Sequence, residues 1–253
     1  PLRDVYKRQA YYVSGSLSWT EGGFDVTTDL LPVPIEVQPN AAIEVDYFHQ
    51  RDVYADDPFT PEVEPSIPYA LGVIVRNTGA GTAGAVRIES GQPEIIDNDK
   101  GLAIDFDLIA TRLDGAPLSR SLALDFGDLG PSDVRLGQWL LQSSLQGHFI
   151  AYEAAFTHID PLGILSPLVR EVRIHEMLRP VQALGALDDG VPDFLVNDEP
   201  DPDDLPDTLH LSDGSVAPVA VLSGGATFDG VPDLDDAEIE LGLPGATGHR
   251  YVR

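Results

Sequence analysis

Short runs of alternating apolar and polar residues dominate this sequence. Residues 11–19 alternate apolar with small polar side chains, and residues 43–48 alternate in the same way. A period of two is typical of a β-strand with one buried face. Gly22-Gly23 predicts a turn after the first run, and the four prolines between Asp56 and Pro68 exclude a helix there. The pattern therefore predicts strands separated by loops.

Similar runs continue along the chain. They predict strands over residues 69–77, 85–90, 102–110, 121–126 and 169–178. Residues 138–145 and 149–156 fit either strands or short helices, and the surrounding strands favour strands for both ranges. About seven strands at this spacing, with turn signals between them, are typical of a Greek-key β-sandwich.

The positions of prolines and a change in composition divide the chain into parts. Residues 10–39, broken by Pro32 and Pro34, fit the end of a preceding β domain and a linker. Residues 40–180 form the predicted Ig-like sandwich, and Pro180 ends its last strand. Residues 181–253 are predicted as a partial, acidic β domain with short strands at 208–211, 216–222 and 238–241. We therefore expect an all-β protein: an Ig-like, Greek-key β-sandwich followed by a second, truncated β domain.

The first nine residues have a different origin in our interpretation. Asp4 to Gln9 reads Asp-Val-Tyr-Lys-Arg-Gln, which resembles a sequencing adapter translated in frame on a metagenomic fragment. A natural basic segment is the alternative. We leave residues 1–9 out of the fold argument. The last residues, 249–253, look like a strand that stops part-way, so we expect an internal piece of a larger protein.

Charge restricts the classes of partner. The formal net charge is −27, and without residues 1–9 it becomes about −29. A protein with this charge repels nucleic acid and anionic membrane surfaces, because proteins bind both of them through Lys and Arg side chains. The chain has no Cys, and no run approaches the roughly 20 apolar residues that cross a bilayer. We expect a secreted or cell-surface protein with neither a nucleic-acid partner nor a membrane-inserted segment.

Two short motifs carry a family resemblance. Leu71 to Ala83 is an apolar strand followed by Asn77-x-Gly79-x-x-x-Ala83, and Phe126 to Pro131 is a later strand that leads into a Gly-Pro turn. These features resemble bacterial CARDB-type Ig-like modules over residues 40–178, although the Pro-Gly order of that family is reversed here. The resemblance implies an Ig-like sandwich in a large surface or secreted protein and no catalytic residues.

One glycine motif has the form of a nucleotide-binding fingerprint. Gly79-Ala80-Gly81-Thr82-Ala83-Gly84 matches G-x-G-x-x-G after an apolar strand. That chemistry requires a helix directly afterwards, whose N-terminus binds the pyrophosphate. Residues 85–90 alternate and contain β-branched side chains, and Gly91 and Pro93 follow them. We therefore interpret the motif as a tight turn between strands.

Other motifs fail on spacing. His175-Glu176 begins like a zinc-protease helix, but Arg179 stands where the second histidine is needed. His158 and Asp160 supply only two ligand types, and a turn explains them better. The chain contains no G-x-S-x-G elbow. We expect no catalytic residues, and we expect the lone aromatics Trp19 and Trp139 to belong to the core more readily than to a sugar-binding platform.

The acidic stretch after residue 187 is the one positive site prediction. Residues 188–253 hold 16 acidic and two basic residues. Calcium takes six to eight oxygen ligands, which carboxylates in loops supply. The EF-hand spacing is absent, and a solvated acidic linker or a salt-adapted surface is the alternative. The candidate calcium ligands are Asp189, Asp193, Asp198, Asp201, Asp203 and Asp204.

Three functions remain open at this stage. We favour a non-catalytic structural, adhesive or interaction module, whose partners are other domains of the same chain and a protein or glycan at a cell surface. An accessory carbohydrate-binding domain of a secreted hydrolase would need several aromatic side chains to converge. A fragment of a salt-adapted enzyme would need a cleft with clustered polar groups. No cofactor other than the calcium of the acidic stretch is expected.

Overall fold

The described part of the chain consists of β-strands and their connections. In the computed structural model the described residues are 9–90, 105–148, 155–157, 168–183, 188–198 and 205–219, and these ranges contain strands and no helix. The described residues accordingly offer no helix that is long and apolar enough to cross a membrane. The all-β, sandwich-like fold class is confirmed.

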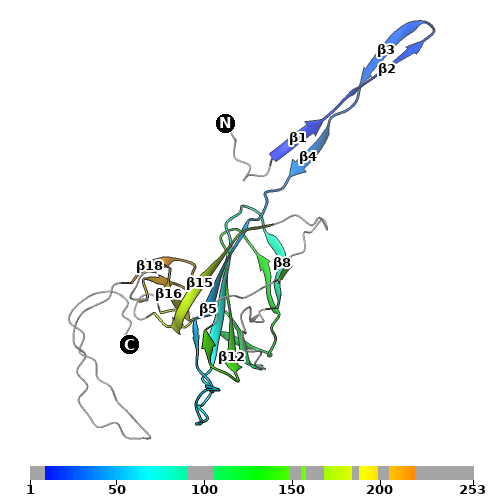
Figure 1. Ribbon diagram of the computed structural model, residues 1–253. Helices are drawn as coiled ribbons and strands as arrows, with labels where there is room; N and C mark the ends of the chain where they lie inside the picture. The colour runs from blue at the N-terminus through cyan, green and yellow to red at the C-terminus, as the bar shows by residue number, and fades with distance from the viewer. Residues whose placement is uncertain are drawn as a thin grey trace.

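Nine strands form the main sheet (Figure 1). Their order across the sheet is β10-β9-β12-β7-β5-β15-β16-β17-β18. The bounds of the central strands are β5 Ile43–Gln50, β7 Tyr69–Asn77, β9 Phe106–Leu113, β12 Val134–Ser143 and β15 Val169–Val181. The outer strands are β10 Ala116–Leu118, β16 Asp193–Asn197, β17 Thr208–His210 and β18 Val216–Pro218. Pairing is antiparallel except between β5 and β15, which run parallel.

A second, three-stranded sheet covers one face of the main sheet. It has the order β11-β8-β14 and consists of β8 Ala83–Ser90, β11 Leu124–Leu129 and β14 Ala155–Thr157. The inward side chains of β5, β7 and β12 meet those of β8 and β11 in the larger apolar core. Trp139 is fully buried there, so its predicted core position is confirmed. A two-stranded pair, β6 Asp52–Val53 with β13 Gly147–His148, lies beside these layers.

The other face of the central strands is also covered. Phe48, Ile74 and Leu136 on that face pack against Met177 of β15 and Phe194 of β16. The Phe194 ring lies so close to Gly72 that a Cβ there would collide with it. Our prediction that residues 43–48 form a half-buried strand is therefore wrong: β5 is buried on both faces because β15 continues the sheet and β16 to β18 fold back over β5.

Most predicted strands are present, with shifts at their ends. The predicted strands at 69–77 and 169–178 correspond to β7 and β15, whereas the one at 102–110 lies at 106–113. The sequence pattern predicted no strand where β16 lies, and the predicted strand at 238–241 lies outside the described residues. Because β15 pairs with both β5 and β16, the strands before and after residue 180 share one sheet.

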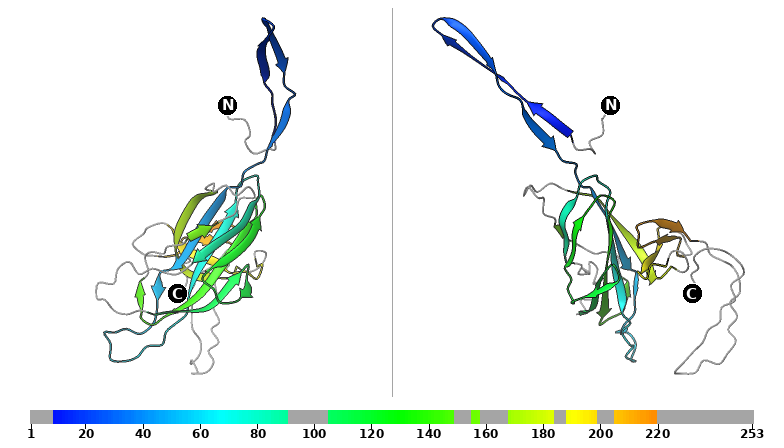
Figure 2. Two further views of the ribbon diagram at one scale, coloured as in Figure 1. Left: turned by 90° about the vertical axis from the view of Figure 1, so that its right-hand side faces the viewer. Right: turned by 180° about the vertical axis from the view of Figure 1, so that it is seen from behind.

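Residues 9–37 form a long two-stranded ribbon that projects away from the sheets (Figures 1 and 2). It consists of β1 Gln9–Val13 paired with β4 Val33–Val37, and β2 Ser16–Glu21 paired with β3 Phe24–Asp29. Gly22 and Gly23 both have positive φ, which suits the tight β2–β3 turn. Trp19 lies on this ribbon with 41% of its surface exposed, so our expectation that it belongs to the core is wrong.

The side chain of Asn77 joins three turns at the base of the ribbon. Its Oδ1 accepts hydrogen bonds from the backbone N–H groups of Ala42 (3.1 Å) and Gly79 (3.0 Å). Its Nδ2 donates to the carbonyl oxygens of Gly81 (2.7 Å) and Leu129 (2.9 Å). A buried amide that satisfies this many backbone groups is expensive to lose.

Glycine is needed in the same turn for a steric reason. A Cβ at Gly79 would collide with the backbone at Ala42, and one at Gly81 would collide with the carbonyl of Pro39. The segment that follows is strand β8 and not a helix. The interpretation of this motif as a tight turn between strands is therefore confirmed.

We expect Asn77→Ala to lower the free energy of unfolding by about 2–4 kcal/mol, because several buried backbone groups would lose their partner. Chemical denaturation followed by circular dichroism measures the change. Thr78→Ala is the matched control, since Thr78 is exposed and its hydroxyl bonds only to Ala42 and Glu44. A loss in N77A no larger than that in T78A would contradict the role assigned to Asn77.

Candidate functional site

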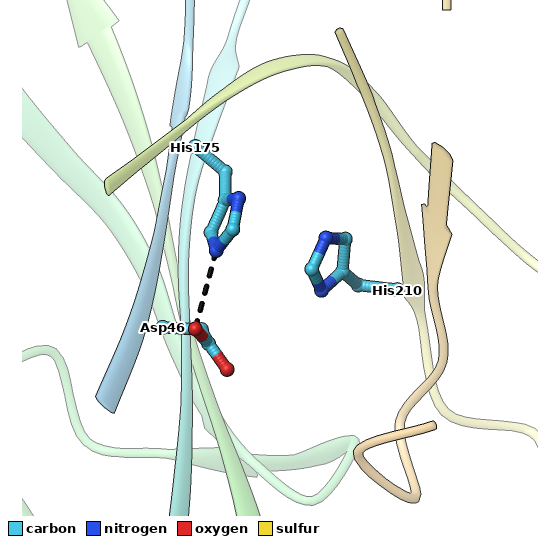
Figure 3. Close-up of side chains that lie close together, drawn as sticks. All are labelled: Asp46, His175 and His210. Carbon is cyan, nitrogen blue, oxygen red and sulfur yellow. Dashed lines mark hydrogen bonds and ion pairs between the residues drawn. The ribbon is translucent and has the colours of Figure 1, made fainter. Parts of the chain in front are cut away.

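Three strands of the main sheet bring Asp46, His175 and His210 together (Figure 3). Asp46 lies on β5, His175 on β15 and His210 at the end of β17. One ligand-type atom from each residue lies within 4.8 Å of the other two, and all three side chains are buried. The cluster sits between the central strands and the layer formed by β16 to β18.

The carboxylate of Asp46 is surrounded by cations. Its side chain is 1% exposed. Arg173 on β15 donates from Nε to Asp46 Oδ1 at 2.6 Å, and the parallel register of β5 and β15 places these two residues opposite each other. Arg76 on β7 donates from Nη2 to Asp46 Oδ2 and from Nη1 to the carbonyl of Gly214 at 2.6 Å. Arg76 therefore ties the turn after β17 to the central strands.

His175 connects two carboxylates. Its Nε2 lies 3.2 Å from Asp46 Oδ1, and its Nδ1 lies 2.7 Å from Asp198 Oδ1. The second oxygen of Asp198 accepts from His210 Nε2 at 3.1 Å. Asp198 thus lies between the two imidazoles at the end of β16.

Aromatic rings pack against the imidazoles. Phe48 stacks on His175 with ring centroids 4.9 Å apart and on Phe194 with centroids 4.4 Å apart. The His175 and His210 rings are themselves 4.4 Å apart. The cluster is therefore a polar site with apolar walls, where water contributes little screening.

These contacts shift the pKa values of the cluster. Burial by itself would lower the pKa of His175, but hydrogen bonds and charge from Asp198 and Asp46 outweigh it and raise the pKa to about 9. Burial would raise the pKa of Asp46, but His175, Arg173 and Arg76 hold it well below its usual range. The pKa of Asp198 is lowered in the same way by His175 and His210. At neutral pH His175 is therefore an imidazolium that donates to both carboxylates.

The cluster contains the residue types that hold a transition metal. Imidazole nitrogens and carboxylate oxygens are common zinc ligands. Asp46 is poorly suited to be one, because two guanidinium groups already occupy its oxygens. Asp198 is better placed, since it faces both histidines.

The structure describes three of the six predicted calcium ligands: it brings Asp189 and Asp193 to one residue and places Asp198 elsewhere. Asp189 and Asp193 both bond to Ser212, through its hydroxyl and its backbone N–H respectively. Asp193 is buried and also accepts from the N–H of Ala183 at 2.8 Å. Asp198 lies at the opposite end of β16, against the histidines. Asp201, Asp203 and Asp204 lie outside the described residues, so the calcium site stays a prediction.

Sequence reasoning missed most of this cluster. We considered His175 only as the start of a zinc-protease helix, and it lies on a strand. Asp46 entered only as one residue of the predicted half-buried strand 43–48, and no motif marked His210. The paired histidines and the aspartates are far apart in sequence, so only the sheet order brings them together. His158 and Asp160 lie outside the described residues.

Comparisons with known proteins place the chain in no family. No family model, no curated protein and no solved structure matches it. The resemblance to CARDB-type modules therefore stays a prediction that rests on the residues quoted above.

We expect Asp46→Asn to lower the free energy of unfolding by about 3–5 kcal/mol, because Arg76 and Arg173 would lose their buried counter-charge. Equilibrium denaturation at pH 7 measures this. Glu171→Gln is the control: Glu171 also pairs with Arg173, but it is exposed, so the loss should stay below about 1 kcal/mol. Equal losses in the two variants would contradict the buried network.

The raised pKa of His175 predicts an alkaline loss of stability. A histidine whose pKa is higher in the folded state stabilises fully below its unfolded pKa of 6.5, and the contribution disappears as the pH rises through about 9. In EDTA-containing buffer, we expect the intact chain to lose on the order of 2 kcal/mol between pH 6.5 and 9.5. His175→Gln should lose much less over that range. If the free energy of unfolding fell equally with rising pH in both proteins, the raised pKa of His175 would be contradicted.

Proposed function

We propose that this chain is a non-catalytic structural or interaction module of a secreted or cell-surface protein. In this proposal the sandwich is the scaffold and the projecting ribbon, residues 9–37, is the contact surface. The observation that carries the proposal is the apolar face of that ribbon.

Cross-strand pairing divides the β2–β3 half of the ribbon into two faces. Trp19 lies opposite Val26, Leu17 opposite Thr28, and Glu21 opposite Phe24, all on one face. The other face carries Ser16, Ser18, Thr20, Asp25, Thr27 and Asp29. Hydrogen bonds between Ser18 and Thr27 and between Thr20 and Asp25 hold that polar face together. The ribbon tip is therefore amphipathic.

The β1–β4 half of the ribbon also exposes apolar side chains, including Tyr12 on the face opposite to Tyr11. Tyr11 lies opposite Ile35 and Val13 opposite Val33, and all four side chains are exposed. Phe24 at the tip is 77% exposed. A two-stranded ribbon is only marginally stable in water, and a large exposed apolar face marks an interaction surface. We infer that this face is buried in the working protein.

A second copy of the module is the partner that we propose for this face. The ribbon has four acidic residues and no basic residue. Asp25 and Asp29 lie on its polar face, whereas Glu21 lies at the tip of the apolar face, where it accepts a hydrogen bond from Trp19 Nε1 at 3.4 Å. Two ribbons packed apolar face to apolar face therefore keep the charges of Asp25 and Asp29 outside the contact. Closed, two-fold assemblies of this kind are the commonest. The ribbon projects away from the sheets (Figure 2), so a contact at its tip lies away from the acidic body of its own chain.

Carbohydrate binding is the second candidate function. Trp19 and Phe24 lie on the same face of the ribbon, which is the convergence of aromatic side chains that a sugar-binding platform requires. Binding to a glycan array by the monomer, abolished in Trp19→Ala, would favour this function over self-association.

We expect the intact chain to form dimers at tens of micromolar protein and Trp19→Asp to be monomeric, because a charge would then lie in the centre of the apolar face. Sedimentation velocity measures both. The dimer should strengthen as NaCl rises from 0.05 to 0.5 M, since salt screens repulsion between two bodies with net charge −27.

Thr27→Asp is the matched control. It places the same charge on the polar face of the same ribbon, so the dimer should persist. Either an intact chain that stays monomeric at 200 µM or a dimer lost equally in both variants would contradict the role of the apolar face.

A further inference from the structure

We propose that the buried cluster is a binding site for a zinc-type transition-metal ion, with His175 Nδ1, His210 Nε2 and the Asp198 carboxylate as its ligands. Asp46 is the outer partner that orients His175. This site is independent of the ribbon and of the function proposed for it.

The Asp198 carboxylate already faces both histidine nitrogens, and the centroids of the two imidazole rings are 4.4 Å apart. The nitrogen–oxygen distances from Asp198 are 2.7 Å to His175 and 3.1 Å to His210. Two ligands at 2.0–2.1 Å from a tetrahedral zinc ion lie roughly 3.3 Å apart. A metal ion can therefore replace the two shared protons if these side chains separate by a few tenths of an ångström.

The position of Asp46 fits that of an outer-shell carboxylate. A histidine that binds a metal through one nitrogen usually donates its other N–H to a carboxylate, which fixes the ring orientation. His175 Nε2 lies 3.2 Å from Asp46 Oδ1 on the side away from Asp198. Arg173 and Arg76 in turn hold the Asp46 carboxylate in place.

The surroundings favour a partly open site. Phe48 packs against both imidazoles and stacks on Phe194, and both histidine side chains are nearly buried. The Asp198 side chain is 32% exposed, so it is the ligand through which the site reaches solvent. Three protein ligands and an open position are typical of reactive zinc sites, whereas closed structural sites have four.

The donor set selects the class of metal. Two imidazole nitrogens and one carboxylate suit zinc, cobalt, nickel or copper ions. Calcium and magnesium prefer a shell of oxygen atoms. Asp198 thus takes part in different chemistry from the calcium site that its acidic neighbours suggested from the sequence.

Isothermal titration of the EDTA-treated intact chain with zinc chloride tests the proposal. We expect one saturable zinc site per chain, for which excess calcium chloride does not compete. His210→Gln should weaken zinc binding at least ten-fold while the glutamine amide keeps a hydrogen bond to Asp198. Asp213→Asn, which removes an exposed carboxylate near β17, should leave zinc binding unchanged.

Nitrogen NMR of the intact chain identifies the ligands without any substitution. Zinc should shift the signals of His175 Nδ1 and His210 Nε2 and leave those of the other four histidines unchanged. Three results would overturn the proposal: no zinc binding at 100 µM zinc, undiminished binding in H210Q, or zinc-dependent shifts confined to other histidines.

Discussion

Burial of both faces of β5 is the constraint on which the rest of this structure depends. One face faces the larger core, and the other is covered because β15 continues the sheet and β16 to β18 fold back over it. This arrangement removes Asp46 from water. A lone buried carboxylate is very costly, so the same layers have to supply cations. Arg76 from β7 and Arg173 and His175 from β15 supply them.

The balance of charge therefore differs between the whole chain and the buried cluster. The chain as a whole carries a large negative excess, which repels other molecules of the same charge. Inside the cluster, positive and negative groups are nearly balanced and strongly coupled, because burial weakens screening. Arg76 extends this coupling to Gly214, so the layer of β16 to β18 is held by charge as well as by the apolar contacts of Phe194.

The ribbon and the cluster both depart from the usual pattern, in which apolar side chains are buried and ionisable side chains are exposed. The ribbon exposes apolar side chains, and the cluster buries ionisable ones. The base of the ribbon is nevertheless firmly held, since Asn77 bonds to Ala42 and the glycines of the following turn permit the close approach of residues 39–42. An exposed apolar ribbon on a firmly held base fits the association that we propose.

The sequence by itself determined the all-β class, most strands of the main sheet and the tight turn at Gly79–Gly81. Period-two alternation and glycine positions are local signals, so they can be interpreted without knowledge of the fold. Sequence reasoning also placed Trp19 in the core and predicted a half-buried strand at 43–48, and both expectations were wrong. Alternation shows that two faces differ, but it cannot show which face another layer will cover. Only the tertiary structure decided that, because β15 carries His175 alongside β5, and β16 and β17 carry Asp198 and His210 back over it.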